Sequence, residues 1–197
     1  EDGSFRHLPS LAELYLSGCS HDNVSWCNTH NRFDGWAVQT FANLTALLVL
    51  DMASNEIEST PGGLFDPLQS LETLYLTNNT LTSSSISEDK FGSSMPSLRE
   101  LHLGGNRIDA LSNSNLRGLA ALEVLDLNHN QIRTIDENAF AGLSGLHTLW
   151  LDGNGIESLP ENLFTGLASL TDLYLYDNAF TEMPALGSGL SSLRTLN

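Results

Sequence analysis

The stretch LHTLWLDGN, residues 146–154, has leucine at its first, fourth and sixth positions and asparagine at its ninth. The same spacing begins at residues 98, 122 and 170, so that four copies follow one another at intervals of 24 residues. A complete copy also begins at residue 71. Copies with one substitution begin at residues 47 and 11, and Leu193 and Leu196 open an eighth. Repeats of this length indicate a solenoid, because a single unit cannot bury its own apolar face and is stable only when its neighbours cover it.

Each repeat is predicted to contribute one short strand. Leu149 and Leu151 alternate with Trp150, which is the period of two expected when leucines face a core and the residue between them faces outward. The asparagine follows where the strand must turn away. Its amide can both donate to and accept from backbone groups, which predicts a buried ladder rather than a binding site. The ladder residues are Asn55, Asn79, Asn106, Asn130, Asn154 and Asn178.

The second half of each repeat supplies another apolar column. It is formed by Phe41, Phe65, Phe140 and Phe164, with Leu116 in the same slot of one repeat, and is predicted to be a second core stack on the convex side. The period is broken twice, by an insertion at about 17–36 and by a serine-rich insertion at about 82–95. Phe91 falls one position out of register beside the second, so a local bulge or loop is expected there.

These repeats resemble the "typical" 24-residue subtype of the leucine-rich repeat and are similar to Toll-like receptor and variable lymphocyte receptor ectodomains. The resemblance implies an α/β repeat solenoid, a horseshoe with a parallel β-sheet on the concave face and loops, short helices or 3-10 turns on the convex side. A single domain over 1–197 is expected, with about seven complete repeats and the start of an eighth. Many such receptors carry a cysteine-rich cap at each end. The chain has neither, which predicts a fragment of a longer protein.

Composition narrows the class of partner. Eight basic residues against 24 acidic ones give a formal net charge of −16, which disfavours nucleic acid and anionic membrane surfaces. No apolar run approaches the roughly 20 residues that span a bilayer, so direct membrane insertion is not expected of this chain. The open end of a repeat sheet makes edge-to-edge pairing into a homodimer an expectation for the isolated chain.

Two further features fit an extracellular protein. Cys19 and Cys27 both lie in the first insertion, where a disulfide would pin the extra loop; two free buried thiols are the alternative. Three glycosylation sequons begin at Asn23, Asn43 and Asn78, although a chain this rich in Asn, Ser and Thr produces such triplets by chance.

The outward slot between the second and third leucines of each repeat carries the candidate ligand-binding residues. This slot and its flanks are rich in aromatic and acidic side chains, which on a rigid scaffold are typical of recognition surfaces. The alternative is that Tyr and Trp are there only because they favour strands. The predicted concave-face residues are Asp51, Tyr75, His102, Asp126, Asn128, His129, Trp150, Asp152, Tyr174, Tyr176 and Asp177, and Tyr15 occupies the same slot in the first repeat.

These residues are compatible with three functions. The favoured one is an extracellular module that binds a neutral or basic protein or a glycan, and the resemblance implies an immune or adhesion receptor. The second is a structural or adhesive protein that self-associates with the help of cations held by Asp126, Asp152 and Asp177. The third is an enzyme using His102, His129 and His147. It is disfavoured because no nucleophile motif, phosphate loop or paired metal-ligand spacing accompanies them. No cofactor and no metal ion are expected.

Overall fold

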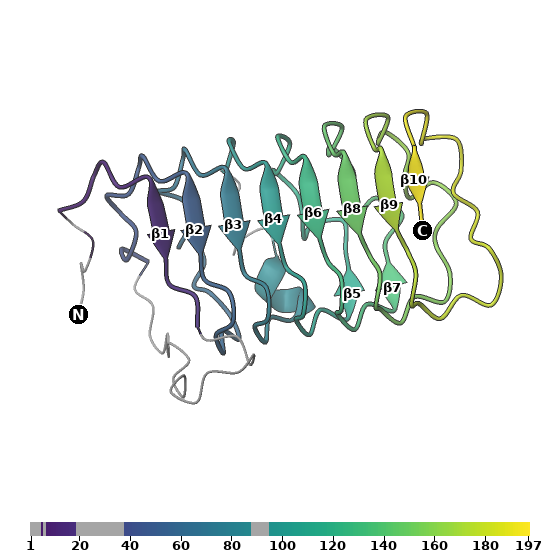
Figure 1. Cartoon of the computed structure of the whole chain (residues 1–197), viewed down its shortest axis with the longest axis horizontal. Helices are drawn as coiled ribbons and strands as arrows, with labels where there is room; N and C mark the ends of the chain where they lie inside the picture. The colour runs from purple at the N-terminus through teal and green to yellow at the C-terminus, as the bar shows by residue number, and fades with distance from the viewer. Residues whose placement is uncertain (1–4, 6, 19–37, 88–94) are drawn as a thin grey trace.

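The computed structural model describes residues 5, 7–18, 38–87 and 95–197, and these form a solenoid built on one parallel sheet (Figure 1). The sheet has eight strands in the order β1-β2-β3-β4-β6-β8-β9-β10. Their bounds are β1 Glu13–Tyr15, β2 Val49–Asp51, β3 Thr73–Tyr75, β4 Glu100–His102, β6 Val124–Asp126, β8 Thr148–Trp150, β9 Asp172–Tyr174 and β10 Thr195–Leu196. This arrangement confirms the predicted leucine-rich repeat horseshoe.

The register of the sheet explains why leucine recurs with such regularity. Leu125 of β6 pairs with Leu101 on one side and Leu149 on the other, so the central residue of every strand lies over the same residue type. In the six inner strands, β2, β3, β4, β6, β8 and β9, these leucines are fully buried and the residues on either side are half-buried. In the edge strands β1 and β10, Leu14 is only partly buried and Leu196 is exposed. The alternation turns the central leucine of each inner strand into the core and leaves two rows of side chains on the outer face.

The convex side is made of turns and short extended segments. The described residues contain no α-helix there. They contain one 3-10 helix, η1 (Ser83–Ile86), and a two-stranded parallel sheet of β5 (Ala110–Leu111) and β7 (Thr134–Ile135). The phenylalanine column packs beneath, with ring centroids 6.4 Å apart both for Phe41 and Phe65 and for Phe140 and Phe164. All of these rings are buried in the same hydrophobic core as the strand leucines.

The serine-rich insertion is tied to the neighbouring repeats at its start. Ser85 and Ile86 of η1 are buried, and the Ser85 hydroxyl donates a hydrogen bond of 2.6 Å to the carbonyl of Glu58. The Ser83 hydroxyl accepts a hydrogen bond of 2.9 Å from the backbone N–H of Ala110. The insertion therefore bridges the repeats before and after it. Phe91 lies outside the described residues.

The six asparagines at the strand ends bind the backbones of adjacent repeats together. In each of the last five, the side-chain oxygen accepts the N–H of a residue one repeat earlier, as Asn130 does from Ile108 at 3.0 Å. The amide nitrogen of Asn130 donates to the carbonyl of Leu127 in its own repeat and of Leu103 in the preceding one. These bonds satisfy polar backbone groups that the turns would otherwise bury without partners.

Several predicted features fall outside the described residues, namely Cys19, Cys27, Asn23 and nearly all of the insertion at about 17–36. The other two sequon asparagines, Asn43 and Asn78, are exposed. Within the described part of the chain, no helix has the length and apolar character needed to cross a membrane.

Candidate functional site

The outer face of the eight-stranded sheet, here called the concave face, carries two rows of side chains. One row is formed by the last residue of each three-residue strand and contains Tyr15, Asp51, Tyr75, His102, Asp126, Trp150 and Tyr174 in register. The other row is formed by the first residue of each strand: Glu13, Val49, Thr73, Glu100, Val124, Thr148, Asp172 and Thr195. Only the former row was predicted from the sequence, although period-two alternation places both rows on one face.

Aromatic rings on neighbouring strands form two stacked pairs. Tyr75 and His102 stack with ring centroids 4.6 Å apart and planes inclined by 16°. Trp150 and Tyr174 stack at 5.8 Å and 14°. Asp126 lies on β6, between the strands that carry the two pairs. The concave face thus presents two aromatic platforms separated by a carboxylate.

His102 is held between carboxylates as well as against Tyr75. Its Nε2 lies 3.4 Å from Glu100 Oε2, and its Nδ1 lies 3.8 Å from Asp126 Oδ2. Burial acts to lower the His102 pKa, but hydrogen bonding and charge interactions with Asp126 and Glu100 act in the opposite direction and leave the pKa raised. Folding therefore makes protonation of the His102 imidazole easier than it is in the unfolded chain.

This arrangement predicts a pH dependence of stability that belongs to His102. A pKa raised by folding stabilises the folded state fully below the unfolded value of about 6.5, and the contribution is lost as pH rises through the folded pKa. Relative to wild type, we expect His102→Gln to lose the most stability near pH 5.5 and less as the pH rises toward 8. Thermal melts of both proteins across this pH range measure the difference in their stability. The other five histidines are present in both proteins, so their contributions cancel in this difference. A difference that stays constant or grows with pH would contradict the assignment.

The position two residues after each strand extends the concave face toward the turns. Asn128, Asp152 and Tyr176 occupy it in three successive repeats. The Asn128 N–H donates to Asp126 Oδ1 at 2.9 Å. Asp152 is fully buried, and neither of its carboxylate oxygens has a hydrogen-bond partner of acceptable geometry among the described residues. Tyr176 is 48% exposed, and its pKa is raised mainly by interaction of its hydroxyl with Asp152.

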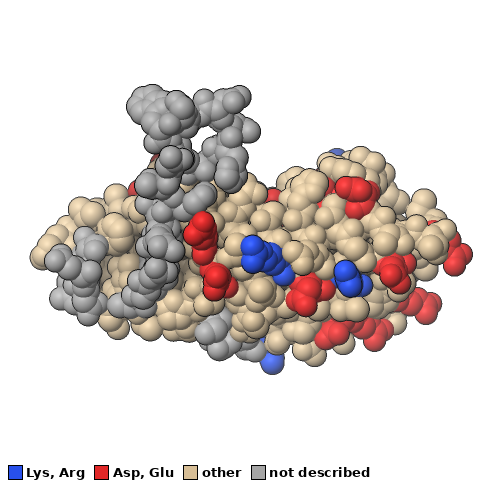
Figure 2. Space-filling view, turned by 90° about the horizontal axis from the view of Figure 1, so that it is seen from below, with Lys and Arg blue, Asp and Glu red and all other residues tan. Residues whose placement is uncertain are grey.

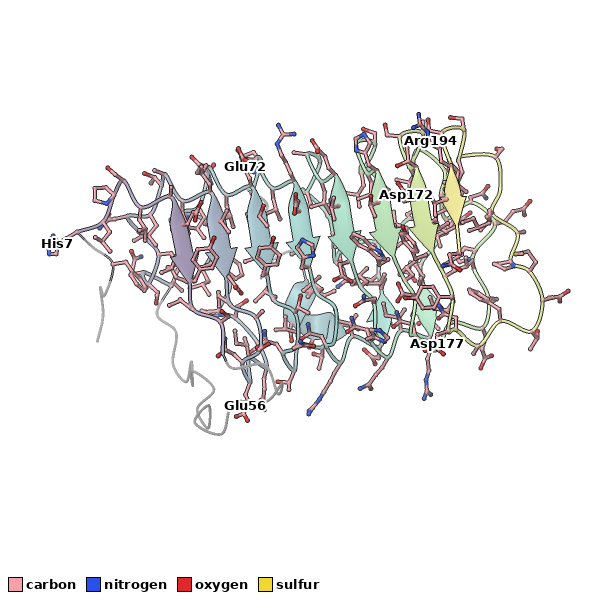
Figure 3. All side chains as sticks on the ribbon, viewed as in Figure 1. His7, Glu56, Glu72, Asp172, Asp177 and Arg194 are labelled. Atoms are coloured by element: carbon pink, nitrogen blue, oxygen red, sulfur yellow. The ribbon has the colours of Figure 1, made fainter. Side chains whose placement is uncertain are left out.

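The structure places His129 and Asp177 at the border of the concave face. Each precedes a ladder asparagine in a left-handed turn, with φ of 49° and 53°. The His129 ring points along the edge toward the next repeat, where a Cβ on Gly153 would lie 2.4 Å from its Nδ1. Asp177 projects at the edge where the strands end (Figure 3). Both side chains are exposed, so they can contact only a partner that reaches past the sheet.

The three histidines weighed for catalysis are not brought together. His102 lies on β4, His129 lies in the turn after β6, and exposed His147 precedes β8. Asp126, Asp152 and Asp177, the possible cation ligands, do not form a metal site either. The described residues contain no group of three or more His, Cys, Asp or Glu that could hold a metal ion.

The electrostatic character of the site is acidic. None of the residues in the two rows of the concave face is Lys or Arg. Arg99, next to β4, forms an ion pair with Glu123 at the edge of the sheet. At the opposite edge, acidic side chains predominate toward the C-terminal repeats (Figure 2).

Asp172, the first residue of β9, already has partners within the protein. Hydrogen bonds from Thr171 and Thr195 lower its pKa, and the charge of Arg194 lowers it further.

An apolar cavity of about 530 Å³ adjoins this region beside β9 and β10. Its walls include Tyr176, Phe180, Met183, Leu186 and Leu196. Tyr176 therefore lines the cavity and also interacts with Asp152.

Comparison with known proteins agrees with this architecture. A family model described as "Leucine rich repeat" matches residues 29–81, 96–156 and 144–197, and one described as "Leucine Rich repeats (2 copies)" matches 69–118. Among solved structures, a TLR13-ssRNA13 complex is similar with a TM-score of 0.65 and 27% identity over 99% of this chain. The internalin inlF from Listeria monocytogenes is similar with a TM-score of 0.63 and 26% identity over 80% of this chain. The chain spans only 33% and 43% of those two proteins. No curated protein matches.

Proposed function

The chain belongs to the leucine-rich repeat family, and from that premise we propose that its concave face recognises a neutral or basic protein. Proteins of this family are generally protein-interaction modules, and the fold is a non-enzymatic scaffold. The observation that carries the proposal is the pair of stacked aromatic platforms, Tyr75 with His102 and Trp150 with Tyr174, on either side of Asp126. Amphipathic rings held on a rigid sheet bury a large area on binding at a small cost in side-chain entropy.

The charge of the surface selects among partners. The net charge of −16 and a concave face without Lys or Arg favour a neutral or basic protein, and salt is expected to slow the association of a basic one. A neutral glycan is the second ligand class that aromatic platforms can hold. One structural neighbour is a complex with single-stranded RNA, but RNA would meet repulsion here. By analogy with the two neighbours, we assign the chain to an extracellular receptor of immune or adhesive function.

The test is a binding screen with the Trp150→Ala, Tyr174→Ala double variant. Wild type and variant are presented with extracellular proteins, glycans and a single-stranded RNA oligonucleotide, and thermal melts check folding. We expect a basic or neutral protein to bind wild type. Its affinity for the double variant should be lower by roughly 100-fold or more, because central aromatic residues dominate such interfaces.

The control is Asn162→Ala, which removes an exposed side chain that lies outside the two rows of the concave face. It should bind as wild type does. A partner that binds the double variant as tightly as wild type would place recognition elsewhere on the molecule. If the wild-type chain bound only the RNA oligonucleotide, the proposal of a protein partner would be contradicted.

A further inference from the structure

Asp152 differs from Asp51 and Asp126, the acids that end β2 and β6, in how its carboxylate is used. Asp51 and Asp126 each accept a hydrogen bond of 2.9 Å from the backbone N–H two residues later, and so stabilise their own turns. Asp152 is fully buried, and both of its oxygens lack such a partner. Burying a carboxylate without donors is costly, so the fold gains nothing evident from an acid at this position.

The surroundings of Asp152 would accept a flat cation. Asn128 and Tyr176 occupy the same position in the adjacent repeats, and Trp150, two residues before Asp152, stacks on Tyr174 of the next strand. Interaction of the Tyr176 hydroxyl with Asp152 raises the Tyr176 pKa, while neither Asp152 oxygen has a hydrogen-bond partner that meets ordinary distance and angle limits. Tyr176 is half-exposed and lines the cavity of about 530 Å³, so its ring has room to move away from the carboxylate.

We propose that Asp152 anchors an arginine side chain of the protein partner, whose guanidinium pairs with both carboxylate oxygens once the Tyr176 ring moves aside. This inference rests on the proposed function of the concave face and names the chemistry of its ligand. Arginine fits better than lysine because two free oxygens match the planar fork of a guanidinium. The neighbouring aromatic faces also attract a delocalised cation.

The probe is Nα-acetyl-arginine methylamide, titrated into the isotope-labelled full chain and followed by NMR. Such a small ligand should bind with a dissociation constant on the order of millimolar. The citrulline analogue has the same shape without the charge, and the lysine analogue has the charge without the fork. We expect shifts at β8, β9 and Tyr176 with the arginine probe, and binding at least roughly tenfold weaker for the other two.

Two variants separate a ligand anchor from a structural acid. Asp152→Asn keeps the shape of the side chain and should weaken the arginine probe by roughly tenfold or more while raising the melting temperature, since an unpaired buried charge is removed. Glu157→Gln removes an exposed carboxylate of the same repeat and should leave both quantities near wild type.

Three results would each overturn the proposal. The first is equal binding of the arginine and citrulline probes, and the second is unchanged binding of the arginine probe to Asp152→Asn. The third is a lower melting temperature of that variant, which would make Asp152 a structural residue. These outcomes are distinct from failure of the proposed function. If the Trp150→Ala, Tyr174→Ala variant loses a protein partner that Asp152→Asn retains, the concave face is a recognition surface and the arginine anchor is wrong. If the double variant retains the partner, the proposed function itself fails.

Discussion

Replacing Asn130 with alanine is expected to lower the free energy of unfolding by about 2–5 kcal/mol, although the side chain contributes little apolar surface. Asn130 is buried at the centre of the ladder. Its loss leaves the N–H of Ile108 without an acceptor and removes a donor from the carbonyls of Leu103 and Leu127. Buried backbone groups left unpaired cost about 1–3 kcal/mol each, and the penalties overlap because one cavity serves all of them.

The measurement is equilibrium urea denaturation of Asn130→Ala beside Asn162→Ala. Asn162 is exposed, and its one described side-chain hydrogen bond is to Glu137 at 2.7 Å. We expect the control to change stability by less than about 0.5 kcal/mol, as surface substitutions usually do. Similar small effects for both variants would mean that the ladder bonds are replaced by solvent and do not hold the repeats together.

Leu149→Ala is expected to cost about 2–5 kcal/mol, through lost burial and the cavity left behind. Leu149 is fully buried and pairs in register with Leu125 and Leu173, so its side chain helps to join three repeats. In a repeat protein the stability of each unit depends on the interface with its neighbours, and a defect at one central strand weakens the array on both sides.

The adjacent residue provides the contrast. Trp150 is larger than Leu149, but it lies half-buried on the concave face, where its stacking on Tyr174 is worth about 0.5–1.5 kcal/mol. Urea denaturation of Trp150→Ala should therefore show a smaller loss than that of Leu149→Ala. A loss for Trp150→Ala that equals or exceeds the loss for Leu149→Ala would make the tryptophan a structural residue and would weaken the case for a recognition surface.

The architecture of this protein follows from its amino-acid sequence alone. The 24-residue interval locates each strand, the alternation around Trp150 turns the leucines inward, and the asparagine marks the end of the strand. These inferences succeed because stacking in a solenoid repeats one local pattern, so a residue's slot in its repeat fixes its row in the fold. The row that contains Tyr75, His102, Trp150 and Tyr174 can be predicted in this way from the sequence.

The interactions among the members of these rows depend on the three-dimensional packing of the repeats. The stacking of Trp150 on Tyr174, the position of His102 between Glu100 and Asp126, and the burial of Asp152 all depend on contacts between repeats. The turning of His129 and Asp177 to the border depends on positive φ angles that a repeat pattern does not specify. The period assigns a residue to a row, whereas ring orientation, burial and hydrogen bonding are set by the neighbouring repeat against which its side chain packs.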